Sequence, residues 1–378
     1  MRFLLIIATL TICTWTNSAA ARQTLESRVL SLAEDVREVM ESDPRVMGQS
    51  LALGQFDGEG DASNSNFGLQ IASQLQAALS SLLVEKSNFT LAGSYHYLQS
   101  EDVASPHSKV LVITAQIKDA RGREVKAISI EINDVDSIYQ ALGLTGSATP
   151  NTTTATEADF RNQAAQRDHE KPTFEAVSTR IAAQNAPQWA VGILRKPSFD
   201  GPTSPITPQN VNGLAYTTIE VNEYYEIELV NNDSSDAVAT VTVDGLDVAN
   251  TFCVDKDLNG KLIRWPGYYV PSGKTVTIRG WLHTVDQTIG DNIFSFRVNK
   301  LGQGAATALK TRGKVGVITV QFREACEPGQ KLRKGRVKGA TEKGETAKGE
   351  GLQEKLEAKP IQIGNQVLST VSIRYNRP

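Results

Sequence analysis

The spacing most suggestive of chemistry is a short acidic stretch with Asp255, Asp257 and Asn259 at alternate positions. An EF-hand calcium loop opens with oxygen ligands placed in this way. Such a loop also requires a bidentate Glu at its twelfth position, and Pro266 stands there instead. The stretch therefore favours a hairpin connection rich in turn-forming residues, with a metal site as the alternative.

Aromatic residues follow in a loop rich in Pro and Gly, where Trp265, Tyr268 and Tyr269 lie close together. Loops on rigid scaffolds often carry binding residues, and aromatic side chains form contact platforms for sugars or proteins. We therefore predict these three as candidate binding residues. Trp281 ends an expected strand, so it is assigned to the core.

Two cysteines, Cys253 and Cys326, remain after a leader segment is removed, and both lie at the ends of expected strands. Export would permit a disulfide between them. Two unpaired structural thiols fit the sequence as well, because connectivity cannot be deduced from sequence. A nucleophilic or metal-binding thiol is disfavoured, since no His or Cys stands near either residue at ligand spacing.

The remaining catalytic signatures are missing from the sequence. The four histidines do not pair at metal-ligand spacing, and no G-x-S-x-G, H-E-x-x-H or C-x-x-C motif occurs. We therefore predict no catalytic residue, no cofactor and no enzymatic activity. A hydrolase stays open as a third hypothesis, because a spatial pair of carboxylates leaves no spacing rule in the sequence.

The first 21 residues predict a secretory signal peptide. Arg2 precedes an apolar run over residues 3–13, and Ala19-Ala20-Ala21 offers a cleavage site. We expect a periplasmic or extracellular protein without a transmembrane segment in the mature chain, since no later apolar run approaches 18 residues. The net charge of −3 argues against nucleic acid as a partner.

Residues 22–143 predict an α/β layer domain. Apolar residues recur at helical spacing along two segments, and three strand-like runs, FTLAGSYHYL, KVLVITAQI and EVKAISIEI, follow the second. The expected order is helix, strand, helix, three strands, helix. The helical stripes are Leu25, Val29, Leu32, Val36 and Val39, then Ile71, Leu75, Ala78, Leu79 and Leu82.

This first domain resembles the CsgG-like periplasmic domain of bacterial envelope proteins. The group includes curli-secretion channel proteins, flagellar-assembly outer-membrane lipoproteins, peptidoglycan-synthase activator lipoproteins and the N-terminal domain of the Tol-Pal β-propeller protein. The shared pattern is Phe56 before a polar loop and helix, then Gly93-Ser94-Tyr95 and Asp119-Ala120 with Gly122. The resemblance implies a non-enzymatic adaptor. The membrane-spanning hairpins and lipid anchor of the channel proteins are missing, so a pore is not expected.

A polar linker is predicted over 144–172, and an antiparallel β-sandwich of the Ig-like type over 173–378. Phe174, Val177 and Ile181 predict a helix over 174–185, and short strands separated by turn signals follow from Leu214. The segment VDGLDV, then VPSGKTVTIRGW and GVITVQF, resembles an uncharacterised β-sandwich domain of exported bacterial proteins. Residues 324–360 are rich in Gly, Lys and Glu, which predicts a solvated, low-complexity insertion. Its basic stretch 331–338, KLRKGRVK, leaves a contact with an acidic polymer or a membrane surface as the alternative.

The sequence thus predicts an α+β, two-domain, exported protein. The favoured hypothesis is a non-enzymatic adaptor or assembly factor that binds a protein partner in the cell envelope. The alternative is a binding module for cell-wall or surface polysaccharide that uses the loop aromatics.

Overall fold

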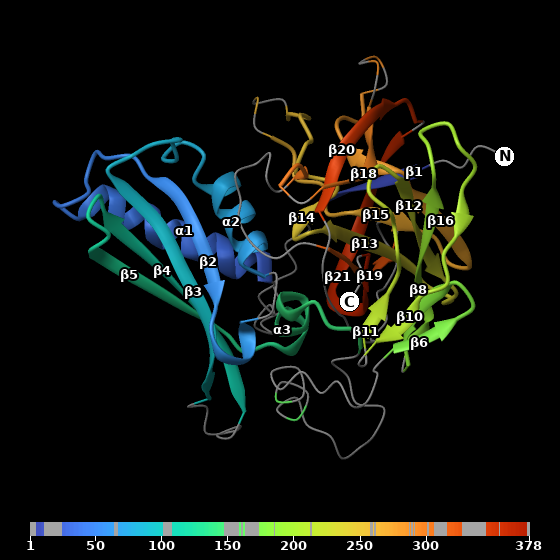
Figure 1. Ribbon diagram of the computed structural model, residues 1–378, viewed down its shortest axis with the longest axis horizontal. Helices are drawn as coiled ribbons and strands as arrows, with labels where there is room; N and C mark the ends of the chain where they lie inside the picture. Colours follow the sequence, from blue (N-terminus) through green and yellow to red (C-terminus); the bar gives the residue numbers. More distant parts are fainter. Residues whose placement is uncertain are drawn as a thin grey trace.

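The structure is a computed structural model in which strands dominate and form three sheets among the described residues. Figure 1 shows the N-terminal helices and sheet on the left and the two larger sheets on the right. The described residues are 5–10, 25–63, 67–100, 108–146, 159, 162, 174–184, 186–211, 214–257, 260, 262–286, 288, 290, 292–300, 302–305, 316–326, 345–354 and 356–375.

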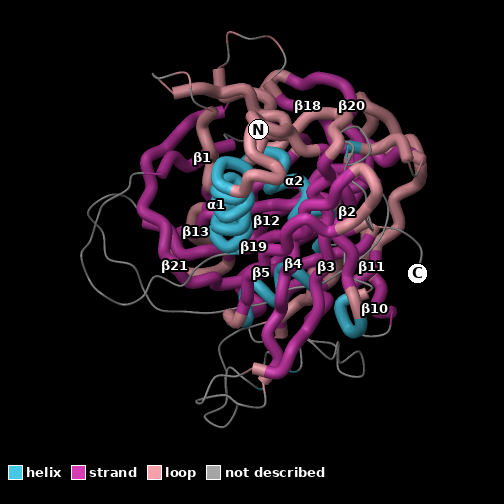
Figure 2. Tube along the Cα trace, turned by 90° about the vertical axis from the view of Figure 1, so that its left-hand side faces the viewer, coloured by secondary structure: helices cyan, strands magenta, loops and turns pink. Residues whose placement is uncertain are grey.

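The N-terminal elements follow the order expected from the sequence. The sheet order is β2-β3-β4-β5, with β2 parallel to β3 and the other pairs antiparallel. Helices α1 and α2 lie side by side against one face of this sheet (Figure 2). Among the described residues, no helix has the length and apolar character needed to cross a membrane. The bounds are α1 Leu25–Ser42, β2 Ala52–Gly58, α2 Phe67–Ala78, β3 Phe89–Gln99, β4 Lys109–Asp119, β5 Glu124–Ile132 and α3 Val135–Leu142, with a short 3-10 turn at Gly60–Ala62.

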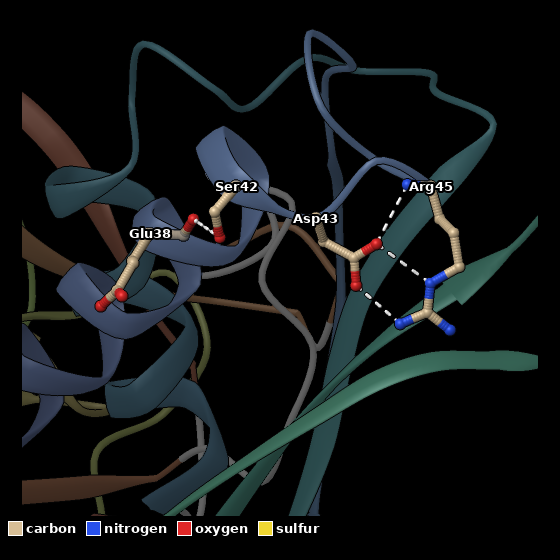
Figure 3. A network of polar contacts seen from close by, with 4 residues as sticks. All are labelled: Glu38, Ser42, Asp43 and Arg45. Carbon is tan, nitrogen blue, oxygen red and sulfur yellow. Dashed lines mark hydrogen bonds and ion pairs between the residues drawn. The ribbon is translucent and has the colours of Figure 1, made fainter.

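Helix α1 is amphipathic, and its end is fixed by a local polar network (Figure 3). Beyond Ser42, the Asp43 carboxylate accepts hydrogen bonds from the backbone N–H of Arg45 at 3.0 Å and from its guanidinium at 2.6 and 3.0 Å. The hydrogen bond from the Arg45 side chain lowers the pKa of Asp43 to about 2. Pro44 follows directly, and the residue before a proline disfavours helical backbone, so the helix stops here.

The residues that carry the family resemblance pack together inside the N-terminal sheet. Phe56 of β2 pairs in register with Gly93 of β3, and a Cβ on Gly93 would lie 2.7 Å from the Phe56 ring and 2.1 Å from the Thr114 carbonyl oxygen. The Tyr95 ring meets Phe67 of α2 edge-on at 5.2 Å. These residues therefore have a packing role in this chain.

The Asp119-Ala120-x-Gly122 pattern forms the β4–β5 turn. The Asp119 carboxylate accepts the backbone N–H groups of Arg121 and Arg123 at 2.8 and 3.0 Å. Gly122 has φ +75°, a conformation that favours glycine. This pattern too is explained by backbone geometry.

The rest of the chain forms two large sheets. Sheet I has the order β1-β15-β13-β19-β21-β11-β10, with β14 beside β13 and a second pairing of β1 with β21. Its strands are β1 Leu5–Leu10, β10 Gln209–Val211, β11 Leu214–Tyr216, β13 Asp236–Val243, β14 Leu246–Asp247, β15 Tyr268–Val270, β19 Val317–Cys326 and β21 Leu356–Arg374.

Sheet II has the order β17-β18-β12-β8-β7-β6, with β16 beside β12, β20 beside β18 and β9 beside β8. Its inward residues, including Trp189, Tyr225 and Trp281, share one core with Val241 and Phe322 of sheet I, so the two sheets face each other. The strands are β6 Phe174–Val177, β7 Arg180–Ala183, β8 Ala186–Lys196, β9 Ser204–Pro205, β12 Tyr224–Asn231, β16 Lys274–Ile278, β17 Gly280–Leu282, β18 Ile293–Asn299 and β20 Glu345–Leu352.

The helix predicted over 174–185 is wrong, because this segment forms the β6–β7 hairpin. Val177 pairs with Arg180 across a tight turn in which Ser178 has φ +60°. Phe174 and Ile181 point into the core, but Val177 is 51% exposed. Three apolar residues at helical spacing were too few to distinguish a helix from a hairpin whose alternation is broken by a turn.

The prediction of a solvated insertion over 324–360 is wrong for its described part. Strand β19 continues to Cys326, residues 345–352 form β20, and β21 begins at Leu356. A Cβ on Gly349 would lie 2.5 Å from the Ser295 hydroxyl, so glycine lets β20 approach β18 closely. The Trp281 indole N–H also donates to the Ala347 carbonyl at 3.3 Å. The basic stretch 331–338 lies outside the described residues.

The N-terminal part contacts the sandwich through the start of α2. Leu69 is fully buried and belongs to the core between sheets I and II, although its helix packs mainly on the N-terminal sheet. Gly245, in the turn between β13 and β14, has φ +76°, and a Cβ built on it would lie 3.0 Å from the backbone nitrogen of Gln70. Figure 1 shows α2 facing β14. Of the predicted linker 144–172, residues 144–146, 159 and 162 are described.

One ion pair crosses sheet II above a glycine. Arg180 of β7 and Glu228 of β12 both stand opposite Gly192 of β8, and their side chains meet at 3.3 Å. A Cβ on Gly192 would lie 2.9 Å from the Glu228 carboxylate. The glycine therefore leaves the space through which the ion pair forms.

Candidate functional site

The acidic stretch at 255–259 is organised around an inward-facing carboxylate. Asp255 accepts hydrogen bonds from the Trp265 indole at 3.0 Å, the Thr284 hydroxyl at 2.5 Å and the Val285 backbone at 3.1 Å. Its Oδ2 also lies 3.3 Å from the Cys253 sulfur. Asp255 therefore ties the loop to the end of β17.

The hairpin interpretation of the same stretch agrees with its backbone contacts. The Asp257 carbonyl accepts the Gly260 N–H at 2.9 Å, and Lys256 forms an antiparallel bridge with Leu262. Asn259, the third candidate ligand, lies outside the described residues. Among the residues that are described, no group of three or more His, Cys, Asp or Glu is placed to hold a metal ion.

The structure buries all three aromatic residues predicted to form a binding surface. With β1 in place, Trp265 and Tyr269 are each 4% exposed and Tyr268 is 1% exposed. Trp265 donates its indole N–H inward, and the Tyr269 hydroxyl donates to Asp236 at 2.5 Å. The expected exposed platform is therefore corrected to a buried one, because the polar atom of each of these two rings finds its partner within the fold.

The two cysteines do not form a disulfide in this structure. The Cys253 thiol contacts Asp255, and the Cys326 thiol lies 3.7 Å from the Gln362 side-chain oxygen. Burial raises the pKa of Cys253 to about 12 and also raises the pKa of Cys326. Of the two alternatives left open by the sequence, the structure has two thiols that are not joined by a disulfide.

The strand β1 occupies a position between β15 and the first part of β21. Its residues pair in parallel with β21, from Leu5 opposite Leu356 to Leu10 opposite Ile361. On its other side, Ile7 pairs antiparallel with Tyr268 of β15. We call this position the β1 slot and define its walls as residues 268–270 and 356–361.

The β1 slot is filled by the segment that the sequence predicts to be cleaved. Residues 5–10 read LIIATL and lie inside the predicted signal peptide. Loss of a strand exposes the backbone N–H and C=O groups of its neighbours, and such an edge is a template for another chain. Removal of residues 1–21 would therefore open the slot on both walls.

Contacts that do not involve β1 hold the two walls near each other. The Lys359 ammonium lies 4.5 Å from the centre of the Tyr269 ring. Ile361 and Tyr269 belong to a small buried cluster with Val238 and Ala325. The wall formed by β15 is fixed in turn, because Tyr269 and Val270 belong to a strand paired with β13.

The sequence predicts binding through the side chains of Tyr268 and Tyr269, whereas in the structure it is their backbone that borders the slot. The apolar run over residues 3–13 predicts a leader, and the strand over residues 5–10 is the feature that this prediction lacks. The β-branched and apolar residues of LIIATL also suit a strand, so this signal was present in the sequence. The long-range pairing with 356–361 has no local signal, because all but the last residue of that segment fall within the low-complexity stretch 324–360.

In comparisons with protein-family models, curated proteins and solved structures, no match to this chain was found.

Proposed function

We propose that this protein is an exported, non-enzymatic adaptor of the bacterial cell envelope that binds a protein partner. In this proposal the chain has two domains, an α/β layer domain over 22–143 and an Ig-like β-sandwich over 173–378. The fold class follows the sequence prediction, and the two facing sheets with their common core support it.

The observation that supports protein binding is the β1 slot. After export and cleavage, the slot would lie open between two strands whose positions are fixed by other contacts. Strand addition to an exposed edge is a common way for one protein to bind a segment of another. The polysaccharide alternative depended on Trp265, Tyr268 and Tyr269. Trp265 and Tyr269 are held by hydrogen bonds to Asp255 and Asp236, which lie outside β1, and this argues against an exposed platform after cleavage.

The test begins with the tagged full chain expressed in the organism that encodes it. We expect N-terminal sequencing of the exported protein to begin at Arg22, and crosslinking in the envelope fraction to give one specific protein partner. A matched sample is crosslinked after denaturation, where the partner should be lost. A chain that keeps residues 5–10 and stays in the cytoplasm contradicts the proposal. Retention on purified peptidoglycan without a protein partner would support the alternative.

A further inference from the structure

We propose that the β1 slot of the processed protein binds an extended, uncharged, apolar segment of a partner protein, which adds as a strand to sheet I. This inference rests on the proposed function, because it requires that the leader be removed. It goes further by specifying the direction, length and chemistry of the bound segment.

The direction and length follow from the pairing of β1. Its six residues pair in parallel with 356–361, and one of them, Ile7, pairs antiparallel with Tyr268 of β15. A bound segment with the same direction satisfies backbone groups on both walls, whereas the reversed direction would change the pairing with each wall. We therefore infer a segment of about six residues, parallel to β21, because that is the length of the paired wall.

The chemistry follows from the residues that line the walls. Ala358 and Pro360 of the second wall are exposed, but with β1 in place four other wall residues, Tyr268, Val270, Leu356 and Ile361, are at most 3% exposed. A charged residue placed among them would lose hydration without a fixed partner, which is costly. Proline would remove a backbone donor, so it is also excluded from the segment. The cis occupant LIIATL has neither a charge nor a proline.

The slot persists without its cis occupant because the walls are connected to each other. The two neighbours of an inserted strand stand about 10 Å apart, twice the spacing of adjacent strands. The contact between Lys359 and Tyr269 joins the two walls directly. A partner segment therefore meets a position that is already formed, which lowers the ordering cost of binding.

The experiment uses the processed protein purified from the exported fraction and a synthetic peptide of residues 3–12, FLLIIATLTI, with lysines added at both ends for solubility. Hydrogen exchange is measured at the amides of 268–270 and 356–361. With the peptide at about ten times its Kd, we expect exchange to slow about tenfold at the wall amides that face the slot, which are alternate residues and do not include Pro360. Amides of the N-terminal sheet, at 109–119, serve as the internal control and should not change.

Peptide variants test that the backbone is recognised. Successive N–H groups of a strand point to opposite neighbours, so methylation of alternate nitrogens blocks one edge at a time. We expect one methylated series to lose protection at 356–361 and the other to lose it at 268–270. A scrambled peptide of equal composition that protects both walls equally well would overturn the proposal, since nonspecific apolar adhesion would then explain binding.

Register is tested by a disulfide between the peptide and the Ala358→Cys variant, in which Cys253 and Cys326 are replaced by Ser. Ile7 stands opposite Ala358, and Leu10 stands opposite Ile361. A peptide with cysteine at the position of Ile7 should crosslink at least about tenfold faster than one with cysteine at the position of Leu10, given their separation along the strand. Equal rates would contradict the register.

The outcomes separate this inference from the proposed function. A specific envelope partner without peptide protection of the walls overturns the inference and leaves the adaptor proposal standing. Peptide protection in a purified chain that is never processed in the cell would support binding at the slot and overturn the proposed function. If 356–361 is already protected in a dimer of the processed protein, the occupant is a second copy and the partner segment is refuted.

Discussion

The contact between the two parts of the protein predicts that one helix residue stabilises a distant core. Leu69 lies on α2, yet its side chain is buried in the core between sheets I and II. Replacing it with Ala removes three carbon atoms and leaves a cavity, which costs about 2–5 kcal/mol for a buried leucine. We therefore expect Leu69→Ala to destabilise the sandwich although no residue of the sandwich has changed.

Two spectroscopic signals can separate the parts. Trp189, Trp265 and Trp281 all lie in the core of the sandwich, so tryptophan fluorescence of the processed chain reports that part. The described helices α1, α2 and α3 all lie in the N-terminal part, so circular dichroism at 222 nm reports it. A loss of about 3 kcal/mol would lower the fluorescence midpoint by about 1 M urea, for an m-value of about 3 kcal/mol per M.

Leu75→Ala is the matched control, because Leu75 is equally buried on the same helix but belongs to the N-terminal core. It should lower the urea midpoint of the dichroism transition. It should lower the midpoint of the fluorescence transition only if the two parts unfold together. The reasoning is refuted if Leu69→Ala lowers the dichroism midpoint but leaves the fluorescence midpoint unchanged.

Three further substitutions or treatments test local geometry. Gly192→Ala should lower the free energy of unfolding by about 0.5–1 kcal/mol in urea unfolding, because its Cβ displaces the ion pair above it; an unchanged or higher value would contradict this. The pKa of Asp43 is lowered from 3.8 to about 2, so its stabilising contribution is present above pH 4 and is lost as the pH falls through 2. Arg45→Ala should return that pKa toward 3.8 in an NMR titration, while Asp119, lowered by a different arginine, stays as it was. Alkylation of Cys253 at pH 8, followed by mass spectrometry, should be far slower in the folded chain than in urea, because burial raises its pKa to about 12; equal rates would exclude this environment.

Much of the secondary structure could be predicted from periodicity. Over the N-terminal part, the first amphipathic stripe lies on α1 and the three strand-like runs form β3, β4 and β5. The second stripe lies on α2 only as far as Ala78, because Leu79 and Leu82 belong to the turn that follows the helix. Each of these segments is long enough for its hydrophobic period to be read without ambiguity. The segment 174–185 was too short for that, and the turn at Ser178 shifted its apparent period toward that of a helix.

Composition misled the prediction where glycine has a packing role. The stretch that contains β20 has few apolar residues, so it was interpreted as solvated. Its order depends on close approach of Gly349 to Ser295 and on the bond from the Trp281 indole to Ala347. Both contacts are made with residues more than fifty positions away, and no local pattern records them. The prediction of an exposed aromatic loop was wrong for a similar reason, since the Trp265 indole donates a hydrogen bond inward to Asp255, ten positions away.

The two interpretations of residues 5–10, leader and strand, are connected through the same physical property. A leader requires an apolar, uncharged run, and so does a strand placed beside buried residues such as Tyr268 and Ile361. A chain that loses this run on export loses a strand that its own sheet can pair with. The walls of the slot are fixed independently, by the pairing of β15 with β13 and by Lys359 against Tyr269. If the leader is removed as proposed, these contacts leave an open sheet edge. Open edges favour uncontrolled association, so we propose that a partner fills the slot.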